Sequence, residues 1–316
     1  MDGTNDALGD LDEALLARCA WLYYNDGLTQ NEIGAQLNIS RIKVSRLLEQ
    51  GRISGLIQVR INSRHQGCLE LEETLRARFG LGDCRVIPDA PADDLNERIG
   101  QAAAQYLMQH LAPDSLLAVG WGATVTHSIR MLGHVARQRG VGLVSLTGGV
   151  RTYVDGMGMA NWDRNIHVIP APLVVADPDL ATALMREPSV ARLMDMALNA
   201  DFKLVGIGEL SEGATVVAQG YLSRDEVEPL RRRGAVGDVL CRLYDEAGQT
   251  LDLPLHRRVV GVDLAQLGGT EKVIGAAGGR AKSKAIGAAL RGRLLDILIT
   301  DETTARLVLE QPGEGA

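Results

Sequence analysis

The stretch from Thr29 to Leu48, TQNEIGAQLNISRIKVSRLL, constrains the fold most, because it predicts two short helices joined by a tight turn. Thr29 and Glu32 form a T-x-x-E capping box, which marks the start of the first helix. Residues 38–40 (NIS) interrupt the helical period, and Ser40 is a suitable N-cap for the second helix. We therefore expect a helical hairpin at residues 29–48.

The apolar residues of this hairpin predict which helix faces are buried. In the second helix Val44, Leu47 and Leu48 form an inward stripe. The opposite face is cationic and rich in hydrogen-bonding groups, which suits insertion into the DNA major groove. The candidate DNA-binding residues are Thr29, Gln30, Ser40, Arg41, Lys43, Ser45 and Arg46. An ordinary helical hairpin with a solvated basic face is the alternative interpretation.

Length and composition indicate the character of the rest of the chain. Its 316 residues are enough for about two domains with a sizeable core. Hydrophobic residues make up 46% of the sequence, but aromatic residues only 3%. The core must therefore be built mainly from Val, Leu, Ile and Ala, with 36 glycines beside them, which is typical of a parallel α/β sheet.

Charge is distributed unevenly along the chain. The net charge of −7 argues against a generally basic nucleic-acid binder. Residues 40–64, however, hold six basic side chains against one acid, a balance of +5. Phosphate affinity depends on such a local patch, so the charge pattern agrees with a DNA-binding hairpin.

Cysteine spacing and terminal composition exclude several other classes of protein. The four cysteines (Cys19, Cys68, Cys84 and Cys241) form no C-x-x-C pair and have no histidines at ligand spacing, so we expect neither disulfides nor a zinc site. The N-terminus is acidic where a signal peptide would be basic and apolar. No apolar run reaches the length of a membrane span. We expect a cytoplasmic protein that does not associate with a membrane.

Composition changes along the chain predict three parts. Residues 1–10 are polar and predict a disordered tail, and residues 11–25 form an amphipathic helix ahead of the hairpin. Residues 56–61 (LIQVRI) alternate like a strand, and a polar connection follows them. We therefore expect a helix-turn-helix domain at 11–62 and an effector-binding and oligomerisation domain at 63–316.

Beyond residue 63 the sequence alternates between apolar runs and helical periods, which predicts βαβ units in an open parallel, Rossmann-like sheet. The expected strands are at 116–119, 141–146, 166–175, 202–205, 259–262, 272–277 and 296–299. The expected helices are at 68–79, 123–139, 181–199 and 281–291.

Glycine turns follow three of these strands. They are Gly120-Trp121-Gly122-Ala123-Thr124, Gly148-Gly149 and Gly206-Ile207-Gly208. Ligands of open parallel sheets bind outside the carboxyl ends of the strands, beside helix N-termini. Each turn alone is more often a simple tight turn, but three at successive strand ends favour one shared polar pocket. None matches G-x-G-x-x-G or a P-loop, so we expect no nucleotide and no other cofactor.

Two charged residues are candidates for the same pocket. Lys282 begins a helix after Gly278-Gly279, where an ammonium group is poorly placed unless an anion lies between it and the helix. This favours a phosphorylated ligand, although Arg280 and Lys284 nearby could equally belong to a solvated face. Asp238 could accept hydrogen bonds from ligand hydroxyls, or could simply cap an element.

The sequence offers little support for catalysis. The six histidines show no H-E-x-x-H pattern, and no serine lies in G-x-S-x-G. Thr300 is expected to cap a helix with Asp301 and Glu302 in its first turn, which is a more common role for two acids than acid/base catalysis. We expect no metal and no enzyme. The alternative is a sugar-phosphate isomerase or transferase with an appended DNA-binding arm.

Taken together, the motifs resemble those of the SorC-type transcriptional regulators of bacterial sugar catabolism. The resemblance covers nearly the whole chain after residue 11, and its motifs are WLYYNDGLTQNEIGAQLNISRIKVSRLL, AVGWGATV, SLTGGV, VGIGEL, GAVGDVLCRLYDEAG, VVGVDLAQL, GGRAKSKAIGAALRG and LDILITDETTARLVL. Any one of them is weak, but the ordered set is specific.

The resemblance implies a fold and a mode of action. It implies an N-terminal helix-turn-helix, an effector domain similar to sugar-phosphate isomerases and CoA transferases, and a homodimer or homotetramer. It also implies that a phosphorylated sugar or polyol controls the affinity for operator DNA. By position, the WGAT and Gly148-Gly149 turns resemble phosphate loops, Asp238 resembles an acid that reads hydroxyls, and Lys282 resembles the lysine of a GG-x-x-K motif.

Overall fold

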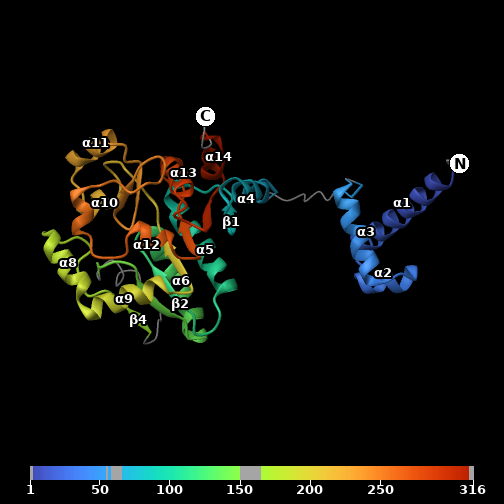
Figure 1. The fold of residues 1–316 in the computed structure, drawn as a ribbon, viewed down its shortest axis with the longest axis horizontal. Helices are drawn as coiled ribbons and strands as arrows, with labels where there is room; N and C mark the ends of the chain where they lie inside the picture. Colours follow the sequence, from blue (N-terminus) through green and yellow to red (C-terminus); the bar gives the residue numbers. More distant parts are fainter. Residues whose placement is uncertain (1–2, 55, 58–65, 150–164, 313–316) are drawn as a thin grey trace. The chain divides into compact units, whose positions relative to one another are not determined.

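The computed structural model describes residues 3–54, 56–57, 66–149 and 165–312 (Figure 1). The chain divides into two compact units, residues 1–63 and 64–316. This division falls one residue after the boundary that we predict between residues 62 and 63. The strand predicted at 56–61 lies largely outside the described residues.

The smaller unit contains three helices within the described residues: α1 (Gly3–Tyr24), α2 (Gln30–Leu37) and α3 (Arg41–Ile53). Helix α1 begins at Gly3, whereas the sequence predicts a disordered tail at 1–10 and a helix from residue 11. The apolar period on which that prediction depends begins only at Leu11, so it could not detect the polar first turns.

The expected caps hold α2 and α3 in place. Thr29 donates from its backbone N and its Oγ1 to Glu32 Oε2, over 2.8 and 2.7 Å, and Ser40 Oγ accepts from the Lys43 N–H over 3.2 Å. The turn between the helices requires a small residue at Gly34, because a Cβ there would lie 2.8 Å from the Ile39 carbonyl oxygen. The core of the unit consists of Leu16, Cys19, Leu22, Ile33, Val44, Leu47 and Leu48.

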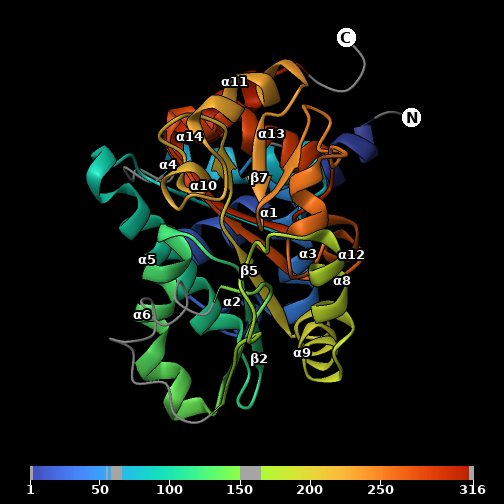
Figure 2. The ribbon, with the colours of Figure 1, turned by 90° about the vertical axis from the view of Figure 1, so that its left-hand side faces the viewer.

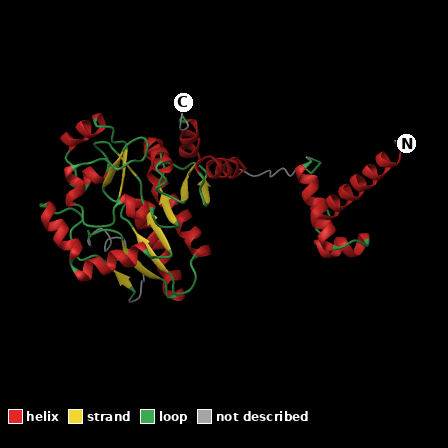
Figure 3. Ribbon diagram, viewed as in Figure 1, coloured by secondary structure: helices red, strands yellow, loops and turns green. Residues whose placement is uncertain are grey.

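Within the described residues, the larger unit holds a seven-stranded sheet in the order β1-β10-β9-β5-β2-β3-β4, and every pairing is parallel (Figure 3). Its strands are β1 (Asp83–Ile87), β2 (Leu116–Val119), β3 (Gly142–Ser145), β4 (Ile166–His167), β5 (Phe202–Val205), β9 (Val273–Ala276) and β10 (Ile297–Asp301). The predicted α/β class with an N-terminal helix-turn-helix is therefore confirmed.

Helices cover both faces of this sheet, as strands that are buried on both faces require (Figure 2). In β2, Leu117 and Val119 face the layer of α5 (Ala92–His110) and α6 (Ala123–Arg139). Ala118 faces the opposite layer. That layer contains α4 (Gln66–Phe79), α9 (Pro188–Leu198), α12 (Leu264–Gly268), α13 (Ser283–Arg291) and α14 (Glu302–Glu310).

A small antiparallel sheet, which the sequence did not predict, lies beside the main one. It consists of β6 (Gly208–Glu209), β7 (Gly237–Val239) and β8 (Arg242–Tyr244). Its strands have two or three residues each, too few for a detectable period. With α10 (Thr215–Ala218), α11 (Arg224–Arg232) and the 3₁₀ turn η1 (Pro254–Arg258) it encloses a separate apolar cluster.

Several predicted elements differ in extent. The helix expected at 181–199 is two helices, α8 (Pro178–Arg186) and α9, because Glu187 is extended before Pro188. The helix expected at 281–291 begins as the 3₁₀ turn η2 (Arg280–Lys282). Of the strand expected at 166–175 only β4 forms as a strand, and residues 259–262 contribute only isolated bridges.

Asp301 joins β10, α14 and the glycine turn before Lys282. It is the N-cap of α14, where the sequence predicts Thr300 in that role. Its buried carboxylate accepts from the backbone N–H groups of Thr304 (3.0 Å) and Gly279 (2.8 Å) and from Thr304 Oγ1 (2.6 Å). One side chain therefore fixes both a helix start and the turn after β9.

Replacing Asp301 with Ala should lower the free energy of unfolding by about 2–4 kcal/mol, because buried donors lose their acceptor. Asp263 is the matched control, since it caps the short helix α12 through one bond to the Gln266 N–H but is less buried. D263A should lower the free energy of unfolding by only about 1 kcal/mol. Urea unfolding followed by circular dichroism measures both, and equal losses would contradict the joining role of Asp301.

Candidate ligand site and nucleic-acid interface

A polar crevice lies at the carboxyl ends of β2, β5 and β9, which are adjacent in the sheet. After β2 the chain continues to β3 on one side, and β5 returns on the other side of β2. Such a switch in strand order leaves a gap between the loops at the sheet edge, where ligands of parallel sheets bind. The predicted position of the site therefore coincides with a crevice in the structure.

The crevice brings together most of the residues that the sequence singled out. Those that line it are Trp121, Gly122, Ala123, Thr124, Gly206, Gly208, Asp238 and Lys282. Gly149 lines an adjoining cavity instead. Gly120 and Gly148 line neither, and their backbone N–H groups donate to Leu204 (2.8 Å) and Val260 (3.0 Å). These two glycines shape the turns and do not face the open space.

Other lining residues were not predicted. Asn96 reaches the crevice from α5, and Thr124 Oγ1 donates to its Oδ1 over 3.1 Å. Ile207, Thr215, Leu240 and Ala276 complete the lining. Two of them carried a usable signal: Ile207 lies in the predicted Gly206-Ile207-Gly208 turn, and Ala276 ends the strand before Gly278-Gly279. The others depend on the packing of elements that the sequence did not reveal.

Asp238 is the most perturbed charged group of the crevice. Its side chain is 7% exposed and lies on β7 opposite Gly208 of β6, where a Cβ would collide with the carboxylate. Burial raises the pKa of Asp238 to about 6, although the hydrogen bond from the Cys241 N–H (3.2 Å) and the charge of Lys282 act to lower it. The carboxylate is thus held in the crevice at a cost in free energy.

The turn after Asp238 is strained in a way that presents the carboxylate. Leu240 and Cys241 connect β7 to β8 with φ angles of 55° and 64°, a left-handed conformation that favours glycine or asparagine. The Cys241 N–H consequently reaches Asp238, and Leu240 enters the crevice. Strain of this kind is often found at functional sites.

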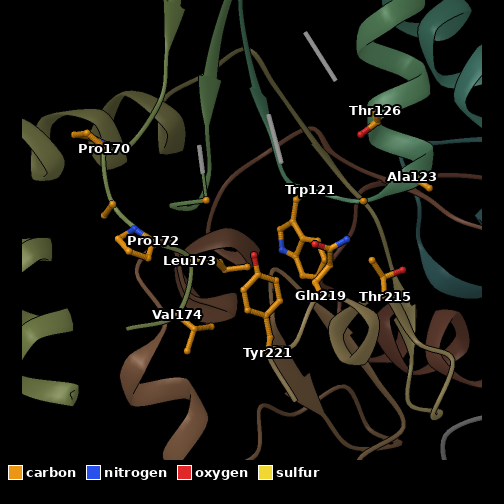
Figure 4. A pocket seen from close by; sticks show the side chains of 13 residues that line it. Trp121, Ala123, Thr126, Pro170, Pro172, Leu173, Val174, Thr215, Gln219 and Tyr221 are labelled. Atoms are coloured by element: carbon orange, nitrogen blue, oxygen red, sulfur yellow. The ribbon is translucent and has the colours of Figure 1, made fainter. Parts of the chain in front are cut away.

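An aromatic cavity of about 700 Å³ adjoins the crevice and shares Trp121, Gly122, Ala123 and Thr215 with it (Figure 4). The rings of Trp121 and Tyr221 meet edge to face, with centroids 5.5 Å apart. The indole Nε1 of Trp121 is buried and has no hydrogen-bond partner among the described residues. Pro170, Pro172, Leu173 and Val174 form the opposite wall.

The volumes indicate how a ligand could use both spaces. The crevice alone holds about 60 Å³, whereas ligand pockets usually have roughly 300–1,000 Å³. A small molecule that contacts Asp238 must therefore extend past Trp121 into the aromatic cavity. The arrangement suits a ligand with hydroxyls at one end and an apolar ring face along its length.

The predicted DNA-binding residues lie together on the smaller unit. Arg41, Lys43, Ser45 and Arg46 are exposed on α3, and the predicted inward stripe of Val44, Leu47 and Leu48 is buried. Thr29 and Ser40 are exposed N-caps, and Gln30 is half-buried at the start of α2. The geometry is that of a helix-turn-helix whose second helix presents an open basic face.

In the described parts of the chain no three potential ligands gather to hold a metal ion, and no helix has the length and apolar character to cross a bilayer. All four cysteines are buried and unpaired. Fold and geometry together define a class of protein: a ligand-responsive DNA-binding protein, with a helix-turn-helix joined to an α/β unit that has a polar site at its sheet edge.

Comparison with known proteins identifies the family within this class. Residues 63–310 match the family model Sugar-bind, described as "Putative sugar-binding domain", and residues 21–52 match the model of sigma-70, region 4. The transcriptional regulators LsrR of Enterobacter sp. (strain 638) and of Klebsiella pneumoniae (strain ATCC 700721 / MGH 78578) are 46% and 45% identical to this chain. The first alignment covers 96% of this chain and 94% of the relative, and the second covers 94% and 93%.

The full-length sorbitol operon regulator SorC from Klebsiella pneumoniae has a similar solved structure, with a TM-score of 0.70 and 28% identity over 95% of this chain and 99% of that one. The chain belongs to the SorC-type family of transcriptional regulators, in which a helix-turn-helix precedes a sugar-binding domain. These relatives are regulators, and they do not favour the alternative of an enzyme with a DNA-binding arm.

Replacing Asp238 with Asn should stabilise the protein at neutral pH. A carboxyl whose pKa is raised on folding binds more protons in the folded state between about pH 4 and 6, so its contribution to stability falls as pH rises through that window. D238N removes this penalty, on the order of 2–3 kcal/mol at pH 8, and the gain should vanish toward pH 4. Urea unfolding at pH 8, 6 and 4.5 measures it. A variant less stable than wild type at pH 8 would contradict the assignment.

Proposed function

We propose that this protein regulates a carbohydrate or polyol catabolic operon from the cytoplasm, and that a phosphorylated sugar or polyol bound at the sheet edge changes its affinity for operator DNA. The observation that carries this proposal is the placement of Asp238 and Lys282 in one crevice that opens on the aromatic cavity. Each part of the site matches one part of such a ligand.

Two features support the phosphate. Helix α6 begins at the WGAT turn, and its N-cap Gly122 offers no side chain to cap the free N–H groups of the first turn. Lys282 lies across the crevice at the start of α13. Backbone donors, the positive end of a helix and an ammonium group together favour an anion.

The sugar or polyol part is supported by different groups. Asp238 offers carboxylate oxygens to ligand hydroxyls, and Asn96 adds an amide from α5. The indole of Trp121 offers an apolar face where the crevice meets the cavity. Gln219 and Thr215 add polar groups on the same side (Figure 4).

The DNA-binding unit would act in pairs. Helix-turn-helix units commonly bind two half-sites through the symmetry of a dimer, so we propose a homodimer or homotetramer. An effector changes operator affinity only to the extent that it binds the two arrangements of the paired units with different affinities. Ligand and DNA are then linked reciprocally, so operator DNA must change effector affinity by the same factor.

A thermal-shift screen of the full-length protein tests the proposal. The panel consists of sugar phosphates, polyol phosphates and each unphosphorylated parent, because a ligand that binds only the folded state raises the melting temperature. We expect a shift confined to phosphorylated compounds. A shift among free sugars alone would overturn the phosphate assignment, and a hit that leaves operator binding unchanged would overturn the regulatory role.

Replacing Arg46 with Ala should weaken operator binding tenfold or more, because a charge-assisted or bidentate contact to DNA is lost. Arg52→Ala is the matched control, since Arg52 is exposed in the last turn of the same helix. Arg52→Ala should change operator affinity only slightly, and effector binding should persist in both variants. Gel-shift titration measures the affinities, and equal values for wild type and R46A would remove Arg46 from the interface.

Replacing Lys282 with Ala should leave operator binding intact while raising the effector concentration needed for half-response about tenfold, because a cation facing the phosphate is removed. Lys284→Ala is the control, since Lys284 is exposed two residues later and does not line the crevice. The response of the DNA complex to the effector found in the screen measures both. An unchanged K282A response would exclude Lys282 from the site.

A further inference from the structure

Helix α3 presents a large apolar side chain at the centre of its exposed face. Ile42 is 80% exposed, and it does not belong to the core that α3 forms with α1 and α2. The sequence features that indicated DNA binding were charge and hydrogen bonding, so Ile42 has no role in the proposed function. Single exposed apolar residues are common, so the position of Ile42 on the recognition helix, and not its exposure alone, decides what it could contact.

The position of Ile42 around the helix axis is informative. Successive residues of a helix are rotated by about 100°. With this rotation, the buried stripe of Val44, Leu47 and Leu48 lies almost opposite Ile42. Ile42 is therefore among the most outward side chains of α3, while Arg41 and Lys43 flank it on either side.

This arrangement divides the exposed face into two kinds of contact. When a recognition helix lies in the major groove, its outermost residues near the N-terminus reach the base edges. Residues on the flanks face the two phosphate backbones. Arg41 and Lys43 occupy flanking positions, whereas Ile42 and Arg46, one turn apart, occupy the centre.

Among the described residues of the smaller unit, none packs against Ile42 as part of the core. A β-branched residue on an exposed helix surface is a poorer helix former than alanine. The exposed surface of Ile42 is available to a partner molecule, and DNA is the molecule that lies against the central N-terminal face of a recognition helix.

The apolar feature that the major groove offers is the C5-methyl group of thymine. We propose that Ile42 is a specificity-determining residue that packs against the C5-methyl group of one or two thymines in each operator half-site. This inference rests on the DNA-binding function and goes further, because it assigns a base and an atom to a residue that carries no charge and donates no hydrogen bond.

The chain supplies a matched control for this assignment. Ile53 is also 80% exposed and lies on nearly the same side of α3, since eleven residues complete about three whole turns. It is, however, about 16 Å farther along the axis, at the C-terminal end of the helix. Ile42→Ala and Ile53→Ala remove the same atoms from surfaces of equal exposure. A difference in DNA affinity between the two variants is therefore due to the position of the residue along the helix.

The experiment begins by selecting an operator from a random duplex library with the full-length wild-type protein. Each thymine of that operator is then replaced by deoxyuridine, which removes only the methyl group, and dissociation constants are measured at fixed salt. The affinity of wild type for the operator should fall about three- to fivefold when thymine is replaced at one or two positions in each half-site. This is the effect expected for one buried methyl group. I42A should bind the thymine operator more weakly and show no further loss at those positions, whereas I53A should behave as wild type.

The outcomes separate this inference from the function on which it rests. If wild type selects no sequence at all, the DNA-binding function fails and the inference fails with it. If wild type selects an operator but tolerates uracil everywhere, only the inference is overturned. The same holds if I42A retains the full uracil penalty, or if I42A binds normally and is defective only in transcription, since Ile42 would then contact a protein.

Discussion

The parallel pairing of β2 with β5 is the constraint on which the larger unit depends. The chain leaves β2 toward β3 and returns to the opposite side of β2 at β5, so the loops that follow these two strands diverge and leave a crevice between them. The WGAT turn, Gly206 and Gly208 meet there because their strands end at the same edge. The small sheet then has only to place one carboxylate, Asp238, over this opening.

Local sequence signals predicted the elements that carry their own period or caps. Strand β2 and helix α6 have the predicted bounds, and the caps at Thr29 and Ser40 form as expected. A competing local effect made one prediction wrong, because Pro188 divides the helix expected at 181–199. Asp301 replaced Thr300 as the cap because its carboxylate also satisfies the Gly279 N–H, a partner 22 residues away.

The candidate site was predictable only in part, because its residues come from two kinds of structure. Glycines at strand ends are visible in a sequence, and Gly122, Gly206 and Gly208 line the crevice. Tyr221 and Pro172 are brought to the cavity by loops without any periodic signal. On α3 the search for charge found Arg46 but passed over Ile42, although the same helical geometry places both at the centre of the exposed face.

Asp238 costs the unliganded protein free energy in two ways. Its burial raises its pKa, and the turn that holds it keeps two residues other than glycine in the left-handed conformation. Both features cost free energy in the unliganded protein. A ligand that donates hydrogen bonds to the carboxylate removes part of the burial penalty, so binding stabilises the arrangement of the loops in which Asp238 faces the crevice. The response to ligand that we propose would depend on how far this gain differs between the two arrangements of the paired DNA-binding units.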